Sequence, residues 1–531
     1  MPPQAVATTD WQAPMIRWPE GRAANLAWTA VVVLLVIVGY LTAGDFGISW
    51  DEPDNAIFGR QALEAYASLH PPAEWHSNLE SKGPFFVALT EALIGPITAI
   101  RGGEAEVEAR HFAYFLILPV AATALYSLGL RIARPWAAFA AALLFLTQPL
   151  IFGHAFINPK DTPFMAFFLA SMALGVSMSE PRGASGNDPP SRGQRTAIPL
   201  AAGAVLGLTT SIRVFGPFAG LLVSLLAVLR LKRRALVPLG LYWVAAGLTT
   251  YLAWPYLWGN PWGRMWDSLG VMLSFPWDNL VLYRGLVYAA KDLPWHYLPF
   301  TTVIQLTEPA LLLAFVGGVV GLVGMVREPR RRLLYAIFFL WTAVPYSVVL
   351  LTRSEVYDNS RQFLFALPPL FLAAALACQG MFSKIHGALV QAALVGLAVL
   401  PGVMAIVRLH PYSYIYYDEL VGGVAGAYRN YELDYWATSY REAMEDLNLL
   451  AAPGATVEVV GPWLSAATFA RLDMIVFKSG ADGSSAYSPD YIMVLTRSNA
   501  DQRLMIGGPP VVQVTVAGAT LAEVRPIEAA P

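Results

Sequence analysis

Residues 25–43, "NLAWTAVVVLLVIVGYLTA", form the first long apolar run, and "ISWDEPDNA" follows at 48–56. An α-helix that crosses a bilayer needs about 20 apolar residues, so the first stretch predicts a membrane span. The second stretch holds three carboxylates within four positions, Asp51, Glu52 and Asp54. Two explanations fit acids at this place: they are solvated where the helix leaves the bilayer, or they are the acidic part of an active site.

The composition is that of a membrane protein. Of 531 residues, 56% are hydrophobic and 14% are charged, whereas a soluble protein carries about 25% charged residues. The net charge of −2, without a basic patch in the sequence, argues against a nucleic-acid partner. The single cysteine, Cys378, excludes an intrachain disulfide and a cysteine-based zinc site.

Eleven apolar stretches have about the length that a span requires, which is roughly 17–25 residues. The expected fold class is therefore a polytopic α-helical membrane protein with about eleven transmembrane helices. The expected spans are 25–43, 111–130, 136–152, 163–179, 197–212, 214–230, 235–254, 309–326, 333–352, 362–380 and 387–407.

One further run, "PFFVALTEALIGPITAI" at 84–100, is short, contains Glu91 and is broken by Pro96. Short basic loops stay in the cytoplasm, and here they all share one side only if this run does not span. We therefore expect 84–100 to lie as a helix in the outer interface. The basic positions that agree are Arg17, Arg22, Arg131, Arg134, Arg182, Arg192, Arg195, 230–234, 327–332 and Lys384.

This topology predicts a multi-pass protein of the inner cell membrane, with a cytoplasmic N-terminus at 1–24 and an extracytoplasmic C-terminus. The acidic cluster and a second polar stretch, "HAFINPKDTPF" at 154–164, then open on the same external side. The transmembrane domain covers 25–410, and its external loops are 44–110, 153–162, 255–308 and 353–361.

The C-terminal part of the chain changes in character. "YREAMEDLNLLA" predicts a helix, and "PGATVEVVG" predicts a turn and then a strand. "MIVFKSG", "DYIMVLTR" and "VVQVTV" alternate or run apolar as strands do. We expect a small extracytoplasmic α/β domain at 430–531.

The external loops bring acids and cations together. A carboxylate can accept the proton of an attacking hydroxyl, and cations can hold a phosphate and stabilise the charge that develops on it. The combination predicts transfer of a group from a lipid-linked phosphate to a hydroxyl. The candidate catalytic acids are Asp51, Glu52 and Asp161, and the candidate phosphate-binding cations are Lys82, Arg110, Lys160, Arg213 and Arg361.

Several of these residues also have plainer explanations. Arg213 can reach the headgroups as snorkelling arginines do, and Arg361 can anchor the span that follows it. Asp161 can cap a helix. A divalent ion on the carboxylates of Asp51 and Asp161 also stays open, because hard cations take oxygen ligands. No nucleotide-binding motif is present, and no other cofactor is expected.

Five motifs occur in order along the chain. They are "WDE" at 50–52, "SKGPFF" at 81–86, "EARHFAYF" at 108–115, "NPKDTPFMAFFLA" at 158–170 and "SRQFLFALPPL" at 360–370. Together they resemble the GT-C superfamily of polyprenyl-phosphate-sugar glycosyltransferases. The nearest branch is glycosyltransferase family 39, the protein O-mannosyltransferase-like and aminoarabinose-transferase-like group. "HPYSYIYYDELVGG" at 410–423 is similar to a bacterial subgroup of it. Gly83 departs from the family, which has a proline there.

The resemblance implies a membrane glycosyltransferase of GT-C type. Such an enzyme moves a sugar, with mannose as a candidate, from a polyprenyl-phosphate donor to a hydroxyl on a protein, glycan or lipid. Transfer takes place on the external face and inverts the anomeric carbon. The site residues that the resemblance implies are Asp51 as base with Glu52 beside it, Asp161 as a second acid, and Lys82, Arg110 and Arg361 on the donor phosphate.

The rival prediction is a polytopic transporter or a flippase for a lipid-linked substrate, without transferase activity. Transporters usually carry ionisable residues near the middle of their spans and often show inverted repeats. Here the polar groups gather in the loops, and no repeat is evident in the sequence.

Overall fold

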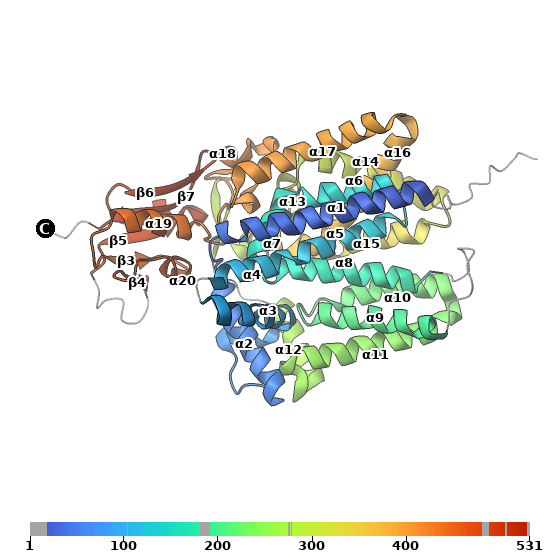
Figure 1. The fold of residues 1–531 in the computed structure, drawn as a ribbon, viewed down its shortest axis with the longest axis horizontal. Helices are drawn as coiled ribbons and strands as arrows, with labels where there is room; N and C mark the ends of the chain where they lie inside the picture. The colour runs from blue at the N-terminus through green and yellow to red at the C-terminus, as the bar shows by residue number, and fades with distance from the viewer. Residues whose placement is uncertain are drawn as a thin grey trace, which may run out of the picture.

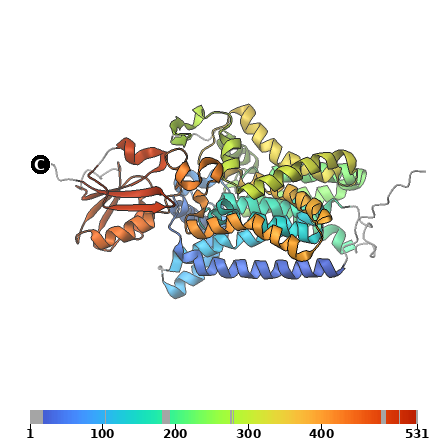
Figure 2. The same ribbon diagram turned by 90° about the horizontal axis from the view of Figure 1, so that it is seen from above.

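A computed structural model describes residues 18–102, 105–180, 192–273, 277, 279–480, 488–504 and 507–527. The molecule is elongated, with helices along its long axis and a β-sheet at one end (Figure 1). Figure 2 shows the same two parts after a turn of 90°. Helix α1 (Trp18–Thr42) begins at the end far from the sheet and finishes near it. Residues 1–17 and Arg182, expected on the cytoplasmic side, lie outside the described residues.

The bundle is arranged around one central helix. In α8 (Asp161–Met178), 72% of the residues are buried, whereas in the most apolar 18-residue segment of α17 (Ala388–Leu409) only 6% are buried. Helix α8 therefore forms the core, and α17 forms the lipid-facing edge. The other bundle helices are α4 (Glu106–Phe115), α5 (Ile117–Gly129), α6 (Pro135–Leu146), α7 (Pro149–Ile157), α9 (Arg192–Thr210), α10 (Pro217–Leu231), α11 (Leu236–Ala253), α14 (Glu308–Arg327), α15 (Arg332–Thr352) and α16 (Pro368–Lys384).

By length and composition, seven described segments can each cross a membrane. An eighth qualifies if α6 and α7, which meet at 61°, count as one bent span. The protein is thus a polytopic helical membrane protein with seven to eight candidate spans in the described part, fewer than the eleven expected. All eleven expected stretches contain helix, but the apolar part of α9 (Thr196–Thr210) and the whole of α16 are too short to qualify. The last of these is shortened because Pro368 and Pro369, which lack an N–H, start a new helix.

One candidate span, 217–253, consists of two helices. Lys232 has a φ of +52° and separates α10 from α11. The indole Nε1 of Trp243 donates to Ser224 Oγ at 3.0 Å, although the two residues are 19 positions apart. In one continuous helix they would be about 28 Å apart along the axis. The segment therefore turns back and passes along the bundle twice.

Shorter elements cover the sheet end of the bundle. The expected helix at 84–100 is α3 (Phe85–Arg101), which does not qualify as a span and packs against α2 (Glu52–Ser68). The contact is close, because a Cβ on Gly59 would lie 2.7 Å from the carbonyl oxygen of Val87. The remaining elements here are η2 (His76–Ser81), α12 (Pro261–Leu273), β1 (Leu280–Tyr283), β2 (Leu286–Ala289), α13 (Tyr297–Ile304), η7 (Arg361–Ala366) and α18 (Gly423–Ala427).

The C-terminal region is a five-stranded mixed sheet in the order β4-β3-β5-β7-β6. Strand β3 pairs in parallel with β4 and β5, whereas β7 pairs antiparallel with β5 and β6. Four strands and the helix α19 were expected, but β7 was not. The acid in its sequence, Glu523, is buried and is satisfied by Gln513 and Arg525. The elements are α19 (Tyr440–Leu450), β3 (Thr456–Val459), α20 (Trp463–Ala467), β4 (Ile475–Lys478), β5 (Tyr491–Leu495), η11 (Arg497–Asn499), α21 (Ala500–Leu504), β6 (Val512–Val516) and β7 (Ala519–Pro526).

Candidate active site

Asp51 immediately precedes α2 and faces cations from other loops. Its side chain is 35% exposed, and its Oδ2 lies 3.6 Å from Lys160 Nζ, in the turn between α7 and α8. Burial alone would raise the pKa of this carboxyl. Attraction to Lys160, Arg361 and Lys82 outweighs burial and lowers the pKa to about 2. The carboxylate is therefore ionised at neutral pH, as a proton acceptor must be.

Asp161 is the first residue of α8 and lies between two arginines. Its side chain is buried, its Oδ1 pairs with the guanidinium of Arg213, and its Oδ2 lies 3.6 Å from Arg361 Nη1. Arg213 comes from the turn between α9 and α10, and Arg361 begins η7. A buried carboxylate is stable only when it is paired, so this acid holds the two cations in place.

Asn158 holds the turn that carries Lys160 and Asp161. Its Oδ1 accepts the backbone N–H groups of Lys160 at 3.1 Å and Asp161 at 2.8 Å, and its Nδ2 donates to Asp161 Oδ2 at 2.9 Å. The capping bonds of α8 therefore come from Asn158, and the side chain of Asp161 does not cap the helix. Asn158 Nδ2 also lies 3.1 Å from His154 Nδ1, and His154 Nε2 lies 2.8 Å from the hydroxyl of Tyr435.

Sequence reasoning did not select Asn158, His154 or Tyr435. An available signal was the Asn-Pro pair three residues before Asp161, because asparagine side chains bond their own backbone in such turns. Tyr435 had no local signal, since it reaches the site only through the fold.

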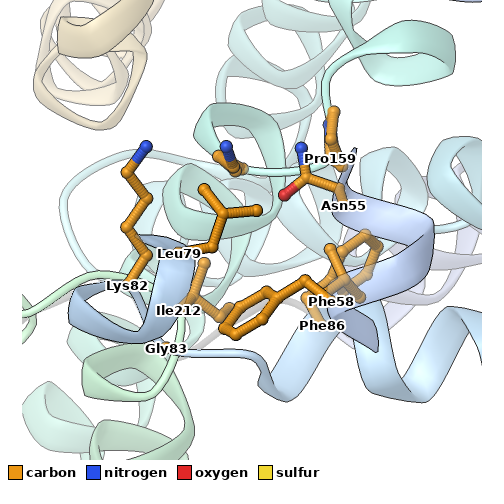
Figure 3. Close-up of a pocket in the computed structure, with 10 residues that line it drawn as sticks. Asn55, Phe58, Leu79, Lys82, Gly83, Phe86, Pro159 and Ile212 are labelled. Atoms are coloured by element: carbon orange, nitrogen blue, oxygen red, sulfur yellow. The ribbon is translucent and has the colours of Figure 1, made fainter. Parts of the chain in front are cut away.

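Lys82 lines a small pocket next to Asn55 and Lys160. Figure 3 shows the Lys82 amine on one side of the pocket and the rings of Phe58 and Phe86 forming an apolar wall. The pocket thus joins a cationic part to an apolar part. Its remaining lining residues are Leu79, Gly83, Val87, Pro159 and Ile212.

Gly83 leaves room for the neighbouring chain. A Cβ at this position would lie 2.0 Å from the carbonyl oxygen of Ser211, which accepts the N–H of Phe85 at 3.1 Å. A proline would clash in the same way. Glycine at this position, where the resembled motif has proline, therefore allows the turn that carries Arg213 to approach this segment closely.

Positive charge is in excess around the pocket. The pKa of Lys82 is lowered to about 7, first by repulsion from Lys160 and then by burial, with Arg213 and Arg361 adding to the repulsion. Within the described residues, the buried Nε atoms of Arg213 and Arg361 have no hydrogen-bond partner. Both observations describe a site that an anion would complete.

Glu52 and Arg110 lie in a separate, closed cluster. The Glu52 side chain is 1% exposed; its Oε2 is 3.1 Å from His111 Nε2 and its Oε1 is 3.8 Å from Arg110 Nη1. Arg110 also pairs with Glu91 at 3.1 Å and with Glu106 at 2.5 Å. Burial raises the pKa of Glu52, but His111 and Arg110 together lower it. The two candidates are thus engaged by protein partners and do not line the pocket.

The donor set around Asp51 and Asp161 does not suit a divalent ion. In the described part of the chain, no three His, Cys, Asp or Glu side chains come together as a metal site would require. Lys160, Arg213 and Arg361 lie against the two carboxylates instead. These cations occupy the positions that a metal ion would need, and they would repel it.

No family model and no curated protein sequence matches this chain. Among solved structures, it is similar to ArnT from Cupriavidus metallidurans in the apo state, with a TM-score of 0.54 and 14% identity over 94% of this chain and 98% of that one. It is less similar to the archaeal oligosaccharyltransferase AglB from Archaeoglobus fulgidus in complex with an inhibitory peptide and a dolichol-phosphate, with a TM-score of 0.48 and 12% identity over 87% and 69% of the two chains.

The arabinofuranosyltransferase AftD from Mycobacteria also matches, with a TM-score of 0.45 and 15% identity over 96% of this chain and 40% of that one. Identities this low establish similarity of fold alone. Of the three, ArnT is matched over nearly its whole length and exceeds a TM-score of 0.5. This chain therefore shares the fold of ArnT.

Proposed function

We propose that this protein is a membrane glycosyltransferase of family 39 type that uses a polyprenyl-phosphate-sugar donor, with mannose as a candidate sugar. The observation that carries the proposal is the excess of cations around Asp51, beside an apolar pocket. Lys82, Lys160, Arg213 and Arg361 surround a place for one more anion, and a lipid phosphate supplies both that anion and an apolar chain. The shared fold with ArnT supports this proposal.

In the proposed reaction, Asp51 accepts the proton of the acceptor hydroxyl. The hydroxyl oxygen forms a bond to the anomeric carbon of the donor, and the bond from that carbon to the phosphate oxygen breaks. The polyprenyl phosphate leaves as an anion, which needs no proton at neutral pH and is stabilised by the four cations. Attack from the face opposite the phosphate inverts the anomeric carbon. The acceptor is a hydroxyl on a protein, glycan or lipid.

The low pKa of Asp51 belongs to the protein without donor. A carboxylate with a pKa of about 2 is a weak base, because Lys160 and the neighbouring cations stabilise its charged form. A phosphate bound among the same cations would compete for them and raise the pKa of Asp51. The base thus becomes stronger when the donor is present.

The other candidate residues receive positioning roles in this proposal. Asp161 orients Arg213 and Arg361, since it is buried between them. Glu52 and Arg110 stabilise the start of α2 from their closed cluster.

We also propose eleven passes and an external sheet. With α6 and α7 counted as one span there are eight candidate spans; the α10–α11 hairpin adds a pass, and α9 and α16 add the other two. The chain enters at the far end of the bundle and leaves it at the sheet end, which requires an odd number of passes. At the far end Arg131 pairs with Glu180, and Arg230 approaches Ser179. Basic residues there suit the cytoplasmic side, with α3 in the outer interface.

Cysteine labelling tests this orientation. Cysteines are placed at Ala73 and Arg330, which are exposed at the sheet end and just beyond α14 at the far end, in a Cys378→Ala background. An impermeant reagent added to intact cells should label position 73 but not position 330. Labelling of position 330 alone would invert the topology and place the site in the cytoplasm.

The functional test is sugar transfer from a synthetic polyprenyl-phosphate donor by the purified protein. Product is followed on a hydroxyl acceptor, together with release of polyprenyl phosphate. Lipid movement without transfer, measured in vesicles of the same composition, would favour the transporter or flippase instead.

A further inference from the structure

A third arginine, after Arg213 and Arg361, reaches the site from the sheet domain. Arg497, in η11 after β5, places Nη2 at 2.6 Å from Oδ1 of Asp358. The other oxygen of that carboxylate, Oδ2, lies 2.9 Å from Nη2 of Arg361. Asp358 is buried, and the two arginines share its single negative charge. Neither the motifs nor the composition indicated a role for Arg497.

Aromatic rings fill the space between and beside the two guanidinium groups. Trp277 and Tyr357 stack with their ring centroids 4.1 Å apart and an angle of 4° between planes. Arg497 lies 5.7 Å from the Trp277 centroid, and Arg361 lies 5.3 Å from that of Tyr357. Arg361 also lies 4.5 Å from the Trp436 ring. Arginines therefore cover the outer faces of the stacked pair, so the pair positions the cations and has no free face for a sugar.

The two turns that present these residues are unusual in the same way. Asp358 and Asn359 have φ values of +52° and +61°, and Ser498 and Asn499 have φ values of +51° and +53°. Left-handed non-glycine residues persist only where their surroundings hold them.

Here both turns bind one residue, Glu432. Its backbone oxygen accepts from Asn359 Nδ2 at 3.1 Å, and its Oε1 accepts from Ser498 Oγ at 2.6 Å. The distance between Arg497 and Asp358 is thereby set by a rigid junction.

We propose that Arg497 is a positioning residue for Arg361, and that the sheet domain thereby completes the donor-phosphate site. Arg497 neutralises Asp358, so that the positive charge and the unpaired Nε of Arg361 are available to the phosphate. Without Arg497, the whole charge of Asp358 would fall on Arg361 and weaken its attraction for an anion. This inference rests on the proposed function in one respect, that Arg361 contacts the donor phosphate.

The test measures equilibrium binding of radiolabelled polyprenyl monophosphate to the purified full-length protein in detergent. Arg497→Gln should raise Kd about 10-fold, the size expected for loss of one charged partner. Adding Asp358→Asn to that variant should return Kd toward the wild-type value, because it removes the uncompensated charge. Arg497→Lys retains the neutralising charge and should bind nearly as the wild type does, which also guards against a folding defect in the glutamine variant.

The matched control is Arg429→Gln. Arg429 also ties the sheet domain to the rest of the chain, with bonds of 2.7 and 2.6 Å to Asp501, two residues after Asn499. It should leave Kd unchanged. The inference is overturned if Arg497→Gln binds like the wild type, if Arg429→Gln weakens binding equally, or if Asp358→Asn fails to restore it. If Lys82→Ala and Arg361→Ala leave Kd unchanged as well, the proposed donor site itself is wrong.

Discussion

Asp51 and Glu52 are neighbours in the sequence, yet they lie in opposite environments. Asp51 is 35% exposed, and its Oδ2 lies 3.6 Å from Nζ of Lys160, which lines the pocket. Glu52 is 1% exposed and is enclosed by His111 and Arg110. Successive residues of a helix point about 100° apart, so the start of α2 directs one acid toward Lys160 and the other into the protein. In the proposed function, Asp51 therefore takes part in the chemistry and Glu52 supports the fold.

The comparison teaches that a cation beside an acid has two meanings. In the closed cluster, Arg110 and His111 lie against acids of the protein, and the cluster stabilises the mouth of the bundle. Around Asp51 and Asp161, the cations outnumber the acids, and the buried Nε atoms of Arg213 and Arg361 lack partners among the described residues. Only the second arrangement leaves charge available for a ligand.

The largest expected effect follows from Asp51→Asn. Asparagine keeps the shape of the side chain but cannot take a proton, so kcat should fall about 10²–10⁴-fold while the melting temperature changes little. Transfer assays and thermal unfolding on the same preparation measure both. Asp54→Asn is the control, because the Asp54 side chain is half exposed and its Oδ1 lies 2.8 Å from His76 Nε2, away from the cations around Asp51. Full activity of the Asp51 variant would mean that Asp51 is not the base.

Next in size are Lys82→Ala and Arg361→Ala. Each removes a charged partner of the donor phosphate, a loss of about 1.5–3 kcal/mol, or roughly 10- to 150-fold in affinity. The donor KM should rise more than kcat falls, in steady-state kinetics with varied donor. Unchanged KM in both variants would mean that the phosphate binds elsewhere.

Glu52→Gln should act on stability instead. The buried partners Arg110 and His111 lose the opposite charge, which should cost about 1–3 kcal/mol of unfolding free energy. Denaturation in detergent measures the loss, and the activity of the remaining folded protein should stay near that of the wild type. A stable but inactive variant would break the comparison, because Glu52 would then take part in the chemistry.

The smallest effect concerns pH. Lys82 binds phosphate in its charged form, and its pKa is lowered to about 7, so the free enzyme loses this charge as the pH rises through 7. kcat/KM for the donor should therefore fall above about pH 7, by no more than the effect of Lys82→Ala, because kcat/KM reports the free enzyme. Lys82→Arg should move this limb to higher pH, since a guanidinium keeps its proton. An identical alkaline limb in the arginine variant would assign it to another group.

Much of the architecture was predictable because it depends on local pattern. The apolar runs predicted helices at all eleven expected positions, and alternation predicted four of the five C-terminal strands. The number of spans was less certain, since glycine, proline and the turn at Lys232 divide apolar sequence in ways that composition does not show. Strand β7 was not predicted, because its sequence contains an acid, Glu523, that is buried only through its bonds to Gln513 and Arg525 in the same sheet.

The candidate site was predictable in part for the same reason. Asp51, Asp161, Lys82, Lys160, Arg213 and Arg361 stood out as charges in an apolar chain, and the fold brings them together. Glu52 and Arg110 stood out equally, and the fold places them in the closed cluster. Charge and position in a loop carry no information about which side of a helix start faces a pocket.

The sequence by itself determined that this is a polytopic helical membrane protein with acids and cations gathered in its loops, because hydrophobicity and charge act locally along the chain. Only the tertiary structure decided which charges satisfy one another and which stay available. It also brought Tyr435, Trp436 and Arg497 from the C-terminal region to residues of the bundle. These arrangements depend on contacts between residues far apart in sequence. Such contacts are needed because a buried charge without a partner has a high free-energy cost.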